Sequence, residues 1–157
     1  MGALAPLLLA FPAIGEVQDG TYALLNTVEE TINIDYNPRK CDLRPIDGSY
    51  NLQTRTITLC TGPEVDANDH DTVRHEVWHA IQHCTTPPNY EGLRPVISVN
   101  DPAWINTIGQ FLSVAQVASI RENYPKYAWD VEMEAHAIAN SLSAEEIEEI
   151  FLLTCAG

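Results

Sequence analysis

A chain of 157 residues has the length of one domain, and its 45% apolar residues suffice to build a hydrophobic core. Only 19% of the residues are charged, which argues against a disordered or fibrous class. The formal net charge of −14 argues against nucleic-acid binding and against adhesion to anionic membranes, because both need clustered Lys and Arg. A preference for cationic substrates is compatible with this charge, but a soluble acidic surface is the simpler explanation.

The N-terminal segment carries no charged side chain. Residues 4–11 could form the apolar part of a signal peptide, with small residues at 13–15 where a signal peptidase would cut. No Lys or Arg precedes Arg39, so the usual basic start of a signal peptide is missing. Residues 1–15 are therefore interpreted as a signal peptide, which favours export, or as an apolar segment packed on a single domain spanning 16–157. No stretch is long enough to span a bilayer as a helix.

The first half of the chain predicts one helix and two strands. A weak helical pattern covers residues 16–31, and alternating apolar residues predict a strand over 31–36. Residues 47–49 (Asp-Gly-Ser) are a turn signal, and a second strand follows over 55–59. This second strand could be an edge strand that pairs with an extended peptide, or an interior strand without such a role.

The second half predicts helices. The segment 71–84 is expected to be helical, and a loop rich in proline separates it from an apolar helix over 103–120. Another helix is expected from about 126 to 142. Residues 143–146 (Ser-Ala-Glu-Glu) form a capping box that opens a last helix ending near 154. The predicted fold class is α+β, with a small sheet, a dominant helical part and the 71–84 helix between them.

An H-E-x-x-H motif stands at His75-Glu76-Val77-Trp78-His79, inside the helix expected over 71–84. Residues four apart share one face of a helix, so His75 and His79 would converge on one point, as zinc ligands do. Glu76 would lie beside them, where it can take a proton from a water molecule. The apolar residues gather on the other side of this helix: Val73, Val77, Ala80, Ile81 and Cys84. The motif predicts one zinc ion per chain, with Glu76 as the general base.

A zinc hydrolase needs a third protein ligand besides the two histidines. His83 lies about 12 Å along the helix axis from His75, too far to join the same coordination sphere. Thr85 stands where metzincins have a third histidine, so the chain is not of that class. The later helix offers Glu132 and Glu134 on opposite flanks of its apolar stripe, and periodicity alone does not decide between them.

The two motif helices together resemble the compact gluzincin-type zinc metallopeptidases, most of all the ImmA/IrrE-type minimal domains. That family pairs H-E-x-x-H with a later helix of the form E-x-x-A-(N/D)-x-(F)-A. This chain reads Glu132-Met133-Glu134-Ala135-His136-Ala137-Ile138-Ala139. The resemblance covers about a fifth of the chain and implies a zincin-like fold. It also implies Glu132 as the third zinc ligand, with Glu134 as the alternative.

The chain departs from the family pattern at His136, where the family has Asn or Asp. In the family this position gives a hydrogen bond that orients a ligand imidazole, and a histidine can also make such a bond. The oxyanion that forms during hydrolysis needs a donor as well. Tyr90, Tyr124, Tyr127 and His136 are candidates for that donor.

Four cysteines, at positions 41, 60, 84 and 155, form an even set without a C-x-x-C pair, which argues against a thiolate zinc cluster. Of the three possible pairings we favour Cys41–Cys60, which closes a strand-and-turn segment, together with Cys84–Cys155, which ties the motif helix to the last helix. Disulfides would agree with export. In a reducing compartment all four would be buried thiols.

The sequence as a whole predicts a zinc metallopeptidase that hydrolyses a peptide or protein substrate. Two alternatives stay open. One is a zinc-binding module without catalysis, which would have no need of Glu76 as a base. The other is a zinc amidase or deformylase, which would use the same groups on a different substrate. No pattern in the sequence predicts an oligomeric state or a cleavage specificity.

Overall fold

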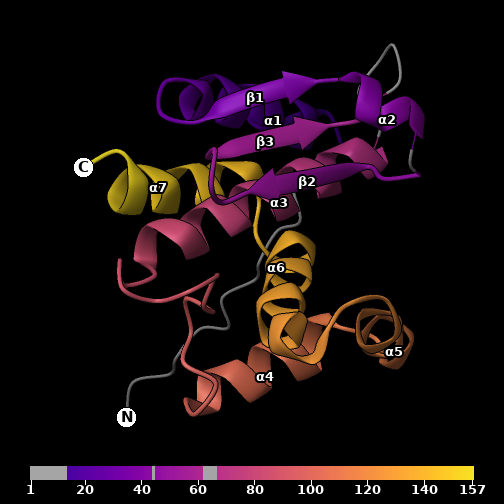
Figure 1. Cartoon of the computed structure of the whole chain (residues 1–157), viewed down its shortest axis with the longest axis vertical. Coiled ribbons are helices and arrows are strands. Elements are labelled where there is room, and N and C mark those ends of the chain that lie inside the picture. Colours follow the sequence, from indigo (N-terminus) through magenta and orange to yellow (C-terminus); the bar gives the residue numbers. More distant parts are fainter. Residues whose placement is uncertain (1–13, 44, 62–66) are drawn as a thin grey trace, which may run out of the picture.

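The computed structural model describes residues 14–43, 45–61 and 67–157 (Figure 1). The cleavable segment considered at residues 1–15 therefore lies almost entirely outside the described residues. The elements follow in this order: α1 Ile14–Glu29, β1 Asn33–Tyr36, α2 Arg39–Leu43, β2 Gly48–Asn51, β3 Thr56–Leu59, α3 Ala67–Thr85, α4 Pro102–Phe111, α5 Val114–Asn123, the 3-10 turn η1 Lys126–Ala128, α6 Trp129–Ser141 and α7 Ala144–Cys155. The fold class is α+β, as the sequence predicted.

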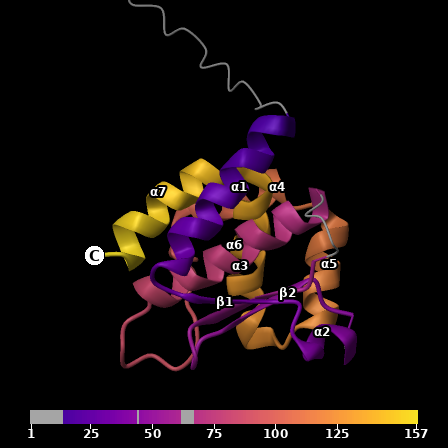
Figure 2. The same cartoon turned by 90° about the horizontal axis from the view of Figure 1, so that it is seen from above.

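The described sheet has three strands in the order β1-β3-β2. Strand β3 runs parallel to β1 and antiparallel to β2, so residues 55–59 form the interior strand and β2 lies at an edge. Figure 2 views the sheet along its edge, with α1, α3 and α7 on one side. Ile57 and Leu59 of β3 are buried against these helices.

Helix α3 is the centre of the molecule, since it packs against the sheet, α1, α6 and α7 (Figures 1 and 2). Its predicted apolar face is buried at Val73, Val77 and Ile81. From α7, Ile147 and Phe151 are fully buried in the same cluster. A helix surrounded in this way must bury its polar face too, and the motif side chains lie on that face.

Helix α6 belongs to two hydrophobic clusters at once. Ala135 and Ile138 pack in the main core with α3, whereas Met133 and Ala137 pack with α4 and α5 around Trp104. Both faces of α6 are therefore covered. Packing on two sides fixes the position of α6, and with it the position of the flank that carries the residues of the candidate site.

The single helix predicted over 103–120 is wrong, because α4 ends at Phe111 and α5 starts at Val114. A capping box makes the break: Ser113 Oγ accepts a hydrogen bond from the Gln116 amide at 3.1 Å, and Gln116 Oε1 accepts one from the Ser113 amide at 3.0 Å. The pattern Ser-x-x-Gln is visible in the sequence and could have located the break.

The turn predicted at residues 47–49 is also wrong, because Gly48 opens strand β2. The chain reverses later, between Asn51 and Thr56, where Asn51 Oδ1 accepts from the backbone amides of residues 53 and 54. Arg55 completes the reversal in the left-handed region, at φ 50°. The short polar strand β2 has little propensity of its own and exists because it pairs with β3.

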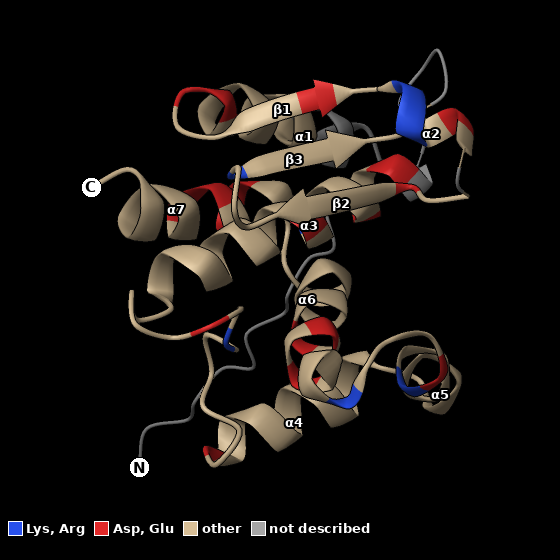
Figure 3. Cartoon of the chain, viewed as in Figure 1, with Lys and Arg blue, Asp and Glu red and all other residues tan. Residues whose placement is uncertain are grey.

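Both predicted disulfides are confirmed: Cys41 is bonded to Cys60 and Cys84 to Cys155. Such bonds suggest an oxidising environment. No helix in the described part of the chain combines the length and the apolar character that crossing a membrane requires. Figure 3 shows acidic residues along most of the helices, with Lys and Arg few and scattered among the described residues.

Candidate metal centre

Three side chains from α3 and α6 converge on one point: His75, His79 and Glu132. The two histidines come from successive turns of α3, and their Nε2 atoms lie 3.0 Å apart. Glu132 reaches them from the first turn of α6, with 3.3 Å between Oε2 and His75 Nε2 and 3.5 Å between Oε1 and His79 Nε2. The structure thus brings together the three residues that the sequence proposed as ligands.

The spacing of these atoms fits a zinc ion. Ligands placed tetrahedrally at about 2.0–2.1 Å from zinc lie about 3.3 Å from one another. The three observed separations, from 3.0 to 3.5 Å, bracket that value. Among the described residues, Glu132 Oε2 is a buried oxygen without a hydrogen-bond partner, which is costly unless a cation meets it. This cluster could therefore hold a metal ion.

The charges within the cluster favour one proton on His79 rather than on His75. Burial lowers the pKa of His75 to about 4. Burial also opposes a charge on His79, but the hydrogen bond and the negative charge of Glu132 outweigh it and raise the pKa of His79 to about 9. Burial opposes a charge on Glu132 too, but the close approach of the two histidine nitrogens, at 3.3 and 3.5 Å, holds its pKa well below the usual range. A metal that binds here would have to displace the His79 proton.

Glu76 lies beside the cluster and is 6% exposed. Burial raises the pKa of this carboxyl to about 7, although the charge of His79 lowers it. Its Oε2 atom has no hydrogen-bond partner within the described part of the chain. A carboxylate whose pKa is raised to about 7 can accept a proton near neutral pH, which is the property that a general base needs.

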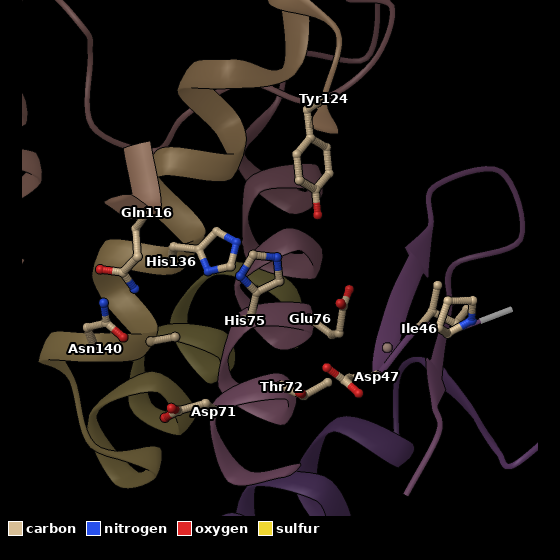
Figure 4. A pocket seen from close by; sticks show the side chains of 13 residues that line it. Ile46, Asp47, Asp71, Thr72, His75, Glu76, Gln116, Tyr124, His136 and Asn140 are labelled. Atoms are coloured by element: carbon tan, nitrogen blue, oxygen red, sulfur yellow. The ribbon is translucent and has the colours of Figure 1, made fainter. Parts of the chain in front are cut away.

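A cavity of about 390 Å³ opens in front of His75 and Glu76. Figure 4 shows the Tyr124 hydroxyl directed toward the space beside Glu76, and the His136 ring next to the ring of His75. Burial and the negative charges of Glu132 and Glu76 raise the pKa of Tyr124 to about 12, so its hydroxyl keeps its proton. The described lining of this cavity contains acidic side chains but no Lys or Arg.

His136 touches His75 through its ring, with 4.2 Å between the ring centroids. Burial lowers the pKa of His136, so this ring is neutral near pH 7. His75 Nδ1 has no hydrogen-bond partner among the described residues. The contact is therefore one of packing, and it differs from the orienting hydrogen bond that the resemblance implied.

Strand β2 forms another side of the cavity and approaches α3 very closely. A Cβ atom at Gly48 would lie 2.6 Å from Thr72 Cγ2 and 3.0 Å from Glu76 Cγ. Only glycine allows this approach without displacing α3 side chains. No pattern in the sequence connected Gly48 with the site.

Glu134, the alternative ligand, points away from the metal centre and is fully buried. Its carboxylate accepts four hydrogen bonds: from Trp78 Nε1 at 3.0 Å, Gln82 Nε2 at 2.8 Å, the Val96 amide at 2.8 Å and the Ile97 amide at 2.7 Å. These donors satisfy both oxygens. Glu134 thus fixes the loop before α4 to helices α3 and α6.

The remaining sequence candidates lie elsewhere. Tyr127 is 87% exposed on η1, and Tyr90 lies in the loop after α3, under the Arg94 guanidinium. The Nδ1 atom of His83 is hydrogen-bonded to the Tyr50 hydroxyl at 2.7 Å, and His83 lines a different cavity. Of the proposed oxyanion donors, only Tyr124 and His136 line the cavity at the metal centre.

The site therefore consists of three convergent side chains that could hold a metal ion, a buried carboxylate beside them and a cavity with a protonated tyrosine hydroxyl on its wall. This arrangement could bind a cation next to a cavity whose walls carry a proton acceptor, Glu76, and a hydrogen-bond donor, Tyr124. Neither a protein-family model, nor a curated protein, nor a solved structure matches this chain.

Proposed function

We propose that this protein is a zinc-dependent metallopeptidase of the compact gluzincin type, with a zincin-like fold. The observation that carries the proposal is the triangle of His75 Nε2, His79 Nε2 and the Glu132 carboxylate, whose edges match those of a zinc tetrahedron. Three protein ligands leave a position for water, as catalytic zinc sites do. The buried Glu76 beside them favours catalysis over a purely structural site, which has no need of a base.

In the proposed reaction a bound zinc ion supplies a Lewis acid for the scissile carbonyl and lowers the pKa of water. Glu76 accepts the proton of the attacking water, because this residue lines the cavity and its Oε2 atom has no hydrogen-bond partner among the described residues. Glu76 then passes this proton to the leaving amine. The Tyr124 hydroxyl keeps its proton at neutral pH and donates a hydrogen bond to the developing oxyanion.

The edge strand β2 supports a peptide as the substrate. Its first residue, Gly48, lines the cavity next to Glu76, and the far side of β2 from β3 is not paired in the described sheet. An extended peptide could add to this edge through main-chain hydrogen bonds and so lie across the metal centre. In this proposal the peptide pairs with β2 and not with residues 55–59, because these residues form the interior strand.

Metal analysis combined with a peptide-cleavage screen tests the proposal. Purified wild type should contain one zinc ion per chain and cleave at least one peptide of a mixed-sequence library. Glu76→Gln should retain the zinc and lose cleavage, and Glu132→Ala should lose both. Glu149→Ala is the matched control, because it removes an exposed carboxylate of α7 outside the cluster and should change neither.

The outcomes separate the alternatives. Wild type without bound metal would overturn the proposal altogether. Zinc bound by wild type without cleavage of any peptide would favour the non-catalytic module, unless small amide substrates are hydrolysed, which would favour the amidase. Full zinc occupancy in Glu132→Ala would refute the assignment of the third ligand.

A further inference from the structure

Gln82 lies one turn after His79 on α3 and is fully buried. Its side chain makes three hydrogen bonds: Oε1 with His79 Nδ1 at 2.7 Å, Nε2 with Glu134 Oε2 at 2.8 Å, and Nε2 with the Val131 carbonyl at 3.0 Å. Every polar atom of this amide is thereby paired. A buried amide satisfied at all its atoms has one orientation.

That orientation determines which nitrogen of His79 carries a proton. The two acceptors on one side of Gln82, a carboxylate and a backbone carbonyl, have no hydrogen to give, so the NH₂ group must face them. The oxygen of Gln82 must then face His79 Nδ1 and accept its hydrogen. With Nδ1 protonated, the neutral imidazole of His79 has its lone pair on Nε2, the atom that points at His75 and Glu132.

The geometry points to Gln82 as a positioning residue that holds His79 in the tautomer and ring orientation a metal ligand needs, with Glu134 locking the Gln82 amide in turn. The inference rests on the proposed function, because it presupposes a metal at His79. It also gives the two glutamates of α6 separate roles: Glu132 faces the ion directly, and Glu134 acts through Gln82.

The Glu134 carboxylate, which fixes the Gln82 amide, is itself held in one orientation. Besides Gln82, Glu134 accepts hydrogen bonds from the Trp78 ring and from two consecutive backbone amides, those of Val96 and Ile97. A carboxylate held by three other donors cannot rotate away from Gln82 without leaving them unpaired. The orientation of His79 is thus tied to the loop that precedes α4.

Two variants of Gln82 separate positioning from stability. Gln82→Met has a similar size and no hydrogen bonds, so it should weaken zinc binding about 10–100-fold, the usual effect of removing a partner that orients a ligand. Gln82→Glu keeps an acceptor for the His79 Nδ1 hydrogen but faces Glu134 with a second carboxylate. It should recover most of the zinc affinity while remaining less stable than wild type.

The measurements are the zinc dissociation constant from competition with a chelator, the visible spectrum of the Co²⁺-loaded protein, and the melting temperature. Val28→Ala serves as the control, because it removes buried volume from α1, which carries no residue of the metal centre. It should lower the melting temperature and leave both zinc affinity and the Co²⁺ spectrum unchanged. Gln82→Met should change the Co²⁺ spectrum as well as the affinity.

An unchanged zinc dissociation constant in Gln82→Met would overturn this inference alone, since the metal site would then exist without the positioning. Equal losses of affinity in Gln82→Met and Gln82→Glu would also overturn it, because affinity would then follow stability. Wild type that binds no zinc would overturn the proposed function and this inference with it.

Discussion

Replacing Glu134 by glutamine should destabilise the protein severely without touching a ligand atom. The carboxylate is fully buried and accepts four N–H donors, three on Oε2 and one on Oε1. A glutamine there has a single oxygen, so at best three donors stay paired and lose the charge of their acceptor, at about 1 kcal/mol each. The Ile97 amide then faces an NH₂ group, which costs about 1–3 kcal/mol more. These contributions add to a loss of about 4–6 kcal/mol, which overlaps the range of about 3–5 kcal/mol for breaking a buried charged pair.

Urea unfolding of the oxidised protein, followed by circular dichroism, measures this loss. Glu149→Gln is the matched control, since Glu149 is exposed on α7 and its replacement should change the unfolding free energy by less than about 0.5 kcal/mol. Amide hydrogen exchange at Ile97 should accelerate strongly in Glu134→Gln, because this amide loses its acceptor, and exchange at Val96 should accelerate less, because its acceptor oxygen remains but loses its charge. A loss below about 1 kcal/mol, with unchanged exchange at these two amides, would refute the role assigned to Glu134.

Three further predictions concern the metal centre itself. Gly48→Ala should lower kcat and leave zinc bound, because the new Cβ presses on Thr72 and Glu76. Adding Thr72→Ser removes the closest atom, Thr72 Cγ2, and should restore part of the activity. Full activity in the Gly48→Ala variant would contradict the close contact. Tyr124→Phe should lower kcat about 10²–10³-fold at unchanged zinc content, the usual effect of removing one oxyanion donor; an effect on KM alone would assign Tyr124 to substrate binding instead. Zinc affinity should rise about tenfold per pH unit from pH 6 to pH 8, because in this range zinc must displace one proton from His79, whose pKa is raised to about 9. Above that pKa the zinc affinity should level off. Chelator competition at each pH checks this dependence, and a slope of zero or two would contradict it.

Local patterns in the sequence predicted most of the helices, because a helix closes its hydrogen bonds within one segment. The capping box at Ser143 correctly located the start of α7. Strand β2 was missed for the opposite reason, since its hydrogen bonds are all made with another strand and its own residues are polar. The break between α4 and α5 was missed because the apolar pattern continues across Ser113, although the capping box was readable there.

The candidate site was predictable up to the choice between two glutamates. Periodicity placed Glu132 and Glu134 on opposite flanks of α6, and both flanks are in fact covered by the protein, so burial alone could not separate them. What separates them is the set of donors each one meets, and the two loop amides at Glu134 come from a segment without regular structure. Gln82 had a readable signal, since it stands three residues after His79 on the same helix face.

The two disulfides bear on the order in which this protein can mature. In the finished protein every cysteine is paired, so no thiolate competes with His75, His79 and Glu132 for a metal. The reduced, unfolded chain has four thiolates that bind zinc strongly and in no fixed geometry. Zinc offered before oxidation would therefore be captured by the cysteines and would delay disulfide formation, whereas oxidation first would leave the proposed site as the preferred one. Refolding with zinc added before or after oxidation would reveal this order as a difference in the yield of correctly paired protein.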